Sequence, residues 1–141
     1  MKLVVDASVA IKWFFGSRPD ESDSSRALDL LRDVGTHRVA LFQPPHFVAE
    51  VAAVLAREMP RAAAANLREL LDIETKVVAG EAVYARAMAL ASRHGQHVFD
   101  TLYHAVALEV EGALLLTADD RYAGKAKSSG RLLRLADYVS P

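Results

Sequence analysis

The sequence predicts an α/β protein, a three-layer α/β/α sandwich around a central and mainly parallel sheet. Two observations support this prediction. Short apolar runs of strand length alternate with longer segments in which apolar residues recur at helical spacing, as in βαβ units. The run Ala113–Thr117 is apolar at nearly every position, as expected of a strand buried on both faces. The chain has 141 residues, so we expect residues 1–141 to form a single domain.

The expected strands and helices follow in order along the chain. The strands span residues 2–6, 39–43, 75–78, 113–117 and 131–135. The helices span residues 7–15, 25–34, 44–57, 60–71, 81–94, 98–111 and 119–126. Prolines open the third and fourth helices, because a first turn does not need the missing N–H. Residues 16–25 are polar and are expected to form a loop.

Composition excludes several classes of protein. The 17 basic and 18 acidic residues nearly cancel, which argues against binding nucleic acid by bulk charge. The absence of cysteine excludes disulfide scaffolds, thiol catalysis and cysteine-bound zinc. The longest apolar runs fall far short of the ~20 residues of a membrane span, and the run after Lys2 is too short for a signal peptide. We therefore expect a cytoplasmic protein that does not bind membranes.

Four acidic residues lie next to or inside apolar segments, where an isolated carboxylate is costly. They are Asp6, Glu50, Asp100 and Asp119. The three aspartates stand at expected helix starts, so each could simply be a helix N-cap. Glu50 is expected in the middle of a helix, where the alternative to a functional role is a buried ion pair with an arginine.

The expected topology favours a shared role for these acids. In an open α/β sheet, ligands bind beyond the carboxyl ends of the strands. Asp6 and Asp119 follow two expected parallel strands, and the helix start at Asp100 points to the same edge. Carboxylates that meet there repel one another unless a cation neutralises them, and oxygen ligands favour Mg²⁺ or Mn²⁺ over zinc. Such a site suits the hydrolysis of phosphodiester bonds.

Four stretches of the chain resemble the PIN-domain family. They read LVVDAS at 3–8, PHFVAEV at 45–51, VFDTLYHAVAL at 98–108 and LLTAD at 115–119. Their order and spacing are similar to those of VapC-type toxin ribonucleases of bacterial toxin–antitoxin pairs, over nearly the whole chain. The resemblance implies a PIN-like fold and an endoribonuclease that depends on Mg²⁺ or Mn²⁺. It also implies a homodimer and an antitoxin protein that blocks the site.

The resemblance assigns a role to each acid by position. Asp6 and Asp100 would be the principal metal ligands, and Asp119 would complete the metal cluster directly or through water. Glu50 would hold metal-bound water or a second cation. Attack of a metal-activated hydroxide on a phosphorus atom of the RNA would then cleave the RNA strand.

Two residues with hydroxyl groups complete the candidate site, and the sequence offers two acids for its last position. By the same resemblance, Ser8 and Thr117 would orient the carboxylates or the substrate phosphate. The last motif contains two adjacent acids, so either could serve the metal. Its spacing from Thr117 favours Asp119 for that role, which leaves Asp120 to cap the following helix.

Other functions stay open at this point. The protein could be an RNA-processing PIN nuclease that is not a toxin, or a PIN-like module that binds without cleaving. A response-regulator receiver would need paired acids near the first strand, and a haloacid-dehalogenase-like phosphatase would need Asp-x-Asp there. This chain has Asp6-x-Ser8, and its second expected strand ends in Phe42-Gln43, so both alternatives are weak.

Histidines and aromatic residues were also considered as functional groups. His46 and Glu50 are four residues apart, as are Asp100 and His104, but no His-Glu-x-x-His motif exists and a zinc site is not expected. The cluster Trp13-Phe14-Phe15 is interpreted first as core packing. A protein interface is the alternative, because aromatic residues are enriched at binding hot spots.

Overall fold

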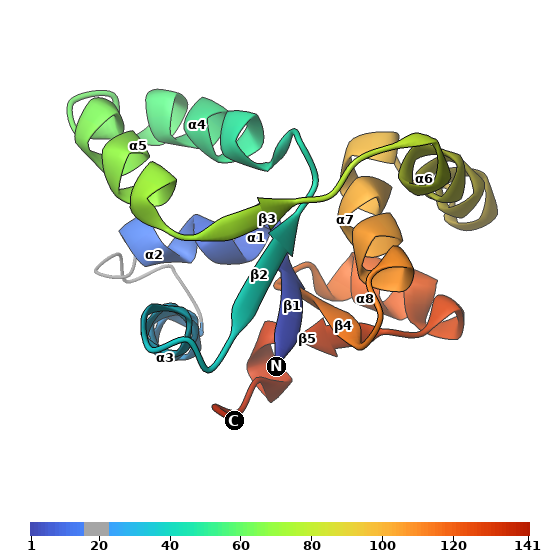
Figure 1. The fold of residues 1–141 in the computed structure, drawn as a ribbon. Helices are drawn as coiled ribbons and strands as arrows, with labels where there is room; N and C mark the ends of the chain where they lie inside the picture. Colours follow the sequence, from blue (N-terminus) through green and yellow to red (C-terminus); the bar gives the residue numbers. More distant parts are fainter. Residues whose placement is uncertain (16–22) are drawn as a thin grey trace.

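The computed structural model describes residues 1–15 and 23–141. These residues contain a parallel five-stranded sheet with the strand order β3-β2-β1-β4-β5 (Figure 1). The strands are β1 Lys2–Val5, β2 Ala40–Gln43, β3 Thr75–Val77, β4 Ala113–Thr117 and β5 Leu132–Arg134. The predicted α/β class and parallel sheet are confirmed.

Helices cover both faces of this sheet. They are α1 Ala7–Ala10, α2 Lys12–Phe15, α3 Ser24–Gly35, α4 Phe47–Glu58, α5 Ala63–Asp72, α6 Glu81–His94, α7 Val98–Glu109 and α8 Asp120–Ala126, with 3₁₀ turns at Lys127–Ser129 and Leu135–Asp137. In Figure 1, α1–α5 lie on one side of the sheet and α6–α8 on the other. The three layers of the predicted sandwich are therefore present.

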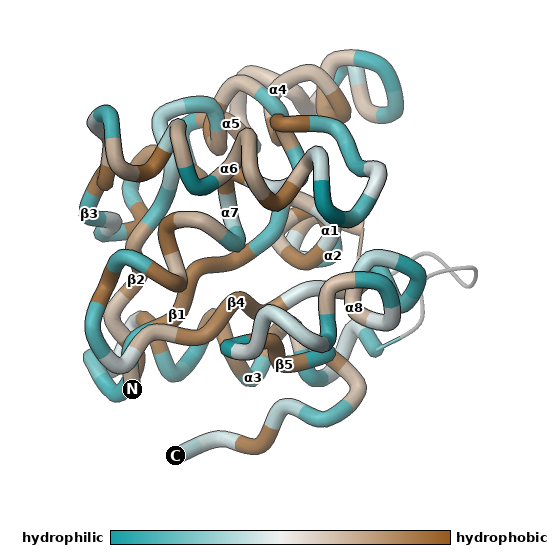
Figure 2. The backbone as a smooth tube through the Cα atoms, turned by 90° about the vertical axis from the view of Figure 1, so that its right-hand side faces the viewer, coloured by the Kyte–Doolittle hydropathy of each residue, from teal (hydrophilic) through white to brown (hydrophobic). Residues whose placement is uncertain are grey.

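The core is centred on β1, β4 and the helix α7. Leu3, Val4 and Val5 of β1 are fully buried, and Figure 2 shows β1 and β4 as hydrophobic stretches within the fold. Helix α7 lies between the sheet and α6, and every residue from Thr101 to Ala107 is buried. Helix α7 therefore packs on the central strands through its middle turns, and its first turn is more exposed.

The register of the central strands sets where the candidate residues emerge. Val5 pairs with Leu116, the next-to-last residue of β4. The backbone N–H of Asp6 donates to the carbonyl of Leu116 at 3.0 Å, which continues the ladder by one step. Asp6 and Thr117 therefore leave the sheet side by side at its carboxyl edge.

The strand order argues against a receiver domain. Receivers belong to the doubly wound plan with the strand order 2-1-3-4-5. Here β1 lies in the centre between β2 and β4, and β3 lies at the edge next to β2. The receiver alternative is wrong for this fold.

Several expected helix boundaries need correction. Neither Pro44 nor Pro60 opens a helix: α4 begins at Phe47 and α5 at Ala63, each after a short turn. The first shift has a steric cause, since Pro45 disfavours the helical region for the residue before it. The expected helix over 7–15 is assigned as α1 and α2, which Ile11 joins. Of the expected loop, residues 16–22 lie outside the described part of the chain, and Ser24 already begins α3.

The aromatic cluster belongs to the core. Trp13 and Phe15 are buried, and the indole N–H of Trp13 donates to the carbonyl of Ala27 at 3.0 Å. The packing interpretation is therefore confirmed for these two residues. In residues 1–15 and 23–141, no helix is both long enough and apolar enough to span a membrane.

Candidate active site

Asp6 is fixed at the carboxyl end of β1 by hydroxyl groups. It caps α1: its carboxylate accepts from the Ser8 backbone N–H at 3.4 Å and from the Ser8 hydroxyl at 3.0 Å. The Thr117 hydroxyl donates to Asp6 Oδ2 at 2.7 Å. Burial raises the pKa of Asp6 to about 6, the Thr117 and Ser8 hydrogen bonds oppose the rise, and the negative charge of Glu50 adds to it. Asp6 is thus both a cap and a costly buried charge.

The loop after β4 is tied to the same place. Ser8 Oγ accepts from the Ala118 N–H at 3.2 Å, and Thr117 Oγ1 accepts from the Asp119 N–H at 3.0 Å. Asp119 caps α8, because its Oδ1 accepts from the Tyr122 N–H at 2.9 Å. The two hydroxyls therefore link the loop that carries Asp6 to the loop that carries Asp119.

The expected helix cap at Asp120 is wrong. Asp120 is the first helical residue of α8, and its side chain is 74% exposed and 3.9 Å from Arg134. Asp119 precedes it with an extended backbone, the conformation in which a side chain can reach back to the helix N–H groups. The cap is thus Asp119, one residue earlier.

Asp100 lies in the first turn of α7 and is not its cap. The cap is His97, whose Nδ1 accepts from the Phe99 N–H at 3.2 Å. Burial raises the pKa of Asp100, and the charge of Asp119 raises it further, against smaller opposing effects of His97 and His46. The N-cap interpretation of Asp100 is therefore wrong, and its carboxylate is left facing other charges.

A chain of polar contacts leads from Asp100 to a lysine. The Gln96 side-chain amide donates to Asp100 Oδ2 at 3.5 Å, and Lys125 Nζ donates to Gln96 Oε1 at 3.0 Å. The lysine belongs to α8, and Gln96 to the turn between α6 and α7. Sequence reasoning did not connect Lys125 to Asp100, because Lys125 and Gln96 are 29 residues apart and nothing in their spacing signals the contact.

Glu50 is held by a tyrosine rather than by an arginine. It is the fourth residue of α4, in the first turn and not in the middle of the helix. The Tyr103 hydroxyl donates a short hydrogen bond to Glu50 Oε2, and His46 Nε2 lies 3.5 Å from the same oxygen. Burial and the Glu50 charge raise the pKa of Tyr103, so the phenol stays a donor. The expected arginine partner is wrong, and Tyr103 was missed, although it lies one turn after Asp100.

The histidines divide into two kinds. The contact of His46 with Glu50 agrees with their spacing of four residues. His104 is fully buried, where its Nδ1 lies 2.9 Å from the Tyr122 hydroxyl and its Nε2 lies 2.8 Å from the carbonyl of Gly130. Burial lowers the pKa of His104, which favours the neutral ring. His104 is thus a structural residue that packs beneath α8.

The four carboxylates influence one another, and among the described residues their one basic neighbour within ion-pair distance is His46 beside Glu50. Asp6 responds to the charge of Glu50, and Asp100 to that of Asp119. In the described part of the chain, no lysine or arginine lies within ion-pair distance of any of the four. An all-oxygen, uncompensated set of this kind fits a hard divalent cation. No three acidic or histidine side chains of residues 1–15 and 23–141 are already gathered as a metal-ligand group, so a cation would require them to turn inward.

The fold and this acidic edge define a parallel α/β protein with carboxylates collected beyond its central strands. The chain belongs to the PIN-domain family, whose model matches residues 3–128. Members of this family are generally nucleases.

Solved structures support the same fold. The structure of VapBC-1 from nontypeable Haemophilus influenzae matches with a TM-score of 0.64 and 13% identity, covering 96% of this chain and 99% of that one. VapBC2 from Rickettsia felis, bound to a DNA fragment from its promoter, matches with a TM-score of 0.60 and 16% identity, covering 95% and 97%. Among curated proteins, none matches the sequence.

Proposed function

We propose that this protein is an endoribonuclease that depends on Mg²⁺ or Mn²⁺ and acts as the toxin of a VapBC-type toxin–antitoxin pair. One observation carries the proposal: four carboxylates that no described lysine or arginine pairs with lie around the carboxyl edge of β1 and β4, and burial raises the pKa of Asp6 to about 6. Membership of the PIN-domain family supports the nuclease part. The similarity to VapBC structures supports the toxin part.

The donor set supports a divalent cation held by Asp6, Asp100 and Asp119, with Glu50 holding water or a second cation. When bound, such a cation supplies an activated water and neutralises charge on the phosphate. Asp6 is the best fixed of these carboxylates, because two hydroxyls and one backbone N–H already orient it. Its hydrogen bonds come from neutral groups, so the negative charge remains available.

The surrounding side chains have positioning roles in this proposal. Ser8 and Thr117 hold the carboxylate of Asp6 and join the two loops of the site. Tyr103 holds Glu50 through a buried hydroxyl that does not ionise in the ordinary pH range. Lys125, linked through Gln96, brings a positive charge to the side of Asp100, where an RNA phosphate would gain from it.

The first test is cleavage of a mixed RNA pool in Mg²⁺, Mn²⁺ or EDTA. Wild type should cleave only with metal, and Asp100→Asn should lower the rate at least about 100-fold, because it removes one carboxylate charge from the site. Asp72→Asn is a matched control: it changes an exposed aspartate at the end of α5 and should leave the rate unchanged. Cleavage that persists in EDTA or in Asp100→Asn would overturn the proposed site.

The toxin role and the partners need their own measurements. Expression in bacteria should arrest growth for wild type and not for Asp100→Asn, and light scattering should give the mass of a homodimer. An antitoxin that blocks the site should restore growth when co-expressed. Cleavage without growth arrest would favour an RNA-processing nuclease, and RNA binding without cleavage would favour a binding module. We expect this activity in the cytoplasm, where the proposed RNA substrate and antitoxin would be found.

A further inference from the structure

An exposed aromatic ring stands directly beside the candidate active site. Phe99 precedes Asp100 in the first turn of α7, and it is 57% exposed. It is the only exposed large apolar residue of α7, and the next residues to be buried begin at Thr101. More than half of the surface of Phe99 is therefore open to solvent next to Asp100.

The ring is part of an ordered stack. The ring centroids of Phe99 and His97 are 4.8 Å apart with an interplanar angle of 27°, and those of Phe99 and His46 are 5.7 Å apart at 28°. His46 in turn lies 4.8 Å from the Tyr103 ring. Backbone contacts fix the same rings, since the Phe99 N–H donates to His97 and His46 Nε2 lies 2.7 Å from the Phe99 carbonyl oxygen. The stack is therefore held in place before any ligand binds.

A shallow, open pocket adjoins this stack. It has a volume of about 250 Å³ and is lined by His46, Ala49, Glu50 and Phe99. One wall is thus aromatic, and another belongs to a carboxylate of the candidate active site. A flat aromatic ligand could lie against Phe99 while the group attached to it reaches the carboxylates.

We propose that the exposed surface of Phe99 that lines this pocket is a stacking platform for one base of a single-stranded RNA whose phosphate lies at the carboxylate edge. The inference deepens the proposed function and depends on it. Stacking on an aromatic ring is tolerant of sequence, because every base has a flat face. A protein interface of ordinary size would involve many residues on each side, whereas this pocket is lined by only His46, Ala49, Glu50 and Phe99.

The test measures RNA binding by variants of Phe99 in an Asp100→Asn background, which removes cleavage. The probe is a fluorescein-labelled single-stranded RNA of mixed sequence and about 12 nucleotides, followed by anisotropy. Phe99→Ala and Phe99→Leu should weaken binding about tenfold, since each removes the flat ring, while Phe99→Trp should stay within about twofold. Phe99→Leu keeps apolar bulk and so separates stacking from simple burial.

Two controls make the outcome decisive. Met88→Ala removes an exposed apolar side chain on α6 and should leave RNA binding unchanged. An oligomer of the same length that lacks bases should bind equally to the Phe99 and Phe99→Ala proteins. Equal binding of the normal RNA by the Phe99, Phe99→Ala and Phe99→Leu proteins would overturn the platform alone, provided that wild type cleaves RNA. If wild type neither binds nor cleaves RNA, the proposed function and this inference both fail.

Discussion

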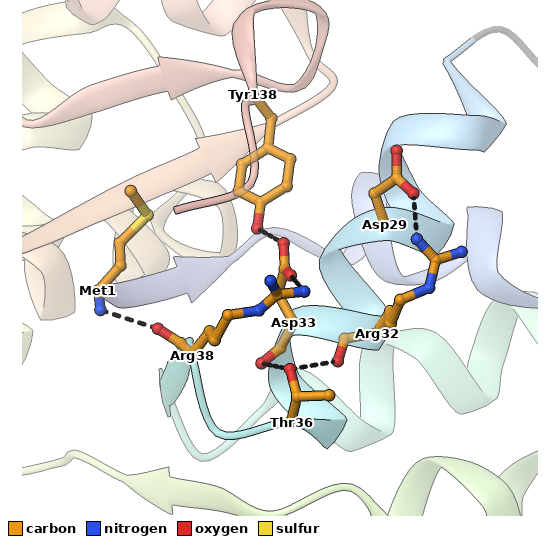
Figure 3. Close-up of polar contacts among 7 residues, drawn as sticks. All are labelled: Met1, Asp29, Arg32, Asp33, Thr36, Arg38 and Tyr138. Carbon is orange, nitrogen blue, oxygen red and sulfur yellow. Dashed lines mark hydrogen bonds and ion pairs between the residues drawn. The ribbon is translucent and has the colours of Figure 1, made fainter.

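Two aspartates of this protein, the fully buried Asp33 and the partly buried Asp6, have opposite surroundings. Asp33 in α3 is fully buried and forms an ion pair with Arg38 at 2.6 Å, and the Tyr138 hydroxyl donates to it at 2.6 Å (Figure 3). Burial would raise the pKa of Asp33, but hydrogen bonds from Tyr138 and Ser140 and the Arg38 charge hold it below its usual value. Asp6 accepts hydrogen bonds from neutral groups only, and its pKa rises to about 6.

This difference separates a compensated carboxylate charge from an uncompensated one. Asp33 draws together the two ends of the chain, since Tyr138 lies 105 residues away and the N-terminal ammonium donates to the Arg38 carbonyl at 3.0 Å (Figure 3). The charge on Asp33 is compensated by Arg38. The charge on Asp6 is left uncompensated, which costs stability but keeps the carboxylate able to bind a cation.

The largest expected effect on stability is the loss of the compensated charge. Asp33→Ala should lower the free energy of unfolding by about 3 kcal/mol, because it leaves the buried Tyr138 hydroxyl without its acceptor and removes the ion pair with the half-exposed Arg38. Urea unfolding followed by circular dichroism measures the change. Asp29→Ala on the same helix is the control: its pair with Arg32 is solvent-exposed and should cost less than about 1 kcal/mol. If Asp33→Ala and Asp29→Ala lost equal free energy of unfolding, the buried pair of Asp33 would stabilise the fold no more than an exposed pair does.

The second prediction is that removing the charge of Asp6 stabilises the protein, whereas removing that of Asp33 destabilises it. In EDTA at pH 7, Asp6→Asn should raise the free energy of unfolding by about 1–3 kcal/mol, because it removes a buried charge and keeps an oxygen that can accept from Thr117. RNA cleavage by Asp6→Asn in Mg²⁺ should fall about as far as cleavage by Asp100→Asn does. A variant that is less stable than wild type at pH 7 would show that the Asp6 charge is compensated after all.

The gain in Asp6→Asn should depend on pH in a defined direction. The pKa of Asp6 lies near 6 in the folded protein against a usual value of 3.8, so the folded state binds the proton more tightly than the unfolded state. The Asp6 contribution therefore lowers stability as pH rises from about 4 through 6, and it vanishes below about 4. Unfolding of both proteins at pH 4 and pH 7 should show equal stability at the lower pH. Asp33 works oppositely, because its lowered pKa gives stability that is lost as pH falls below 3.8.

The same contrast explains which parts of the molecule could be predicted. The carboxyl-edge position of Asp6 follows from a short apolar strand, since the register with β4 then brings Thr117 beside it. Asp33 gave no signal: it looks like one polar residue of an amphipathic helix, and its partner Tyr138 is distant in sequence. The role of Tyr103 was missed for a related reason. Its hydrogen bond joins α7 to Glu50 of α4, and the residue spacing within neither helix indicates such a contact.

Helix ends show a finer limit of sequence reasoning. The start of α6 at Glu81 agreed with the prediction, but α4 began three residues late, after Pro44-Pro45. At α8, the choice between Asp119 and Asp120 depended on one backbone conformation, which two adjacent acids do not reveal. The pattern of apolar and polar residues predicts that a helix is present, and the backbone dihedral angles at its start determine which residue caps it.

The smallest expected effect on stability and cleavage is that of changing Asp120. This acid adjoins the candidate site, so it tests whether an exposed carboxylate differs from the four acids of the site. Asp120→Asn should change the free energy of unfolding by less than about 0.5 kcal/mol, because its exposed side chain makes only a distant contact with Arg134. RNA cleavage should stay within about twofold of wild type. Asp119→Asn should likewise keep stability, since asparagine also caps helices well, but cleavage should fall strongly. If Asp120→Asn abolished cleavage and Asp119→Asn did not, the metal-binding role would move to Asp120, and Asp119 would be a cap and nothing more.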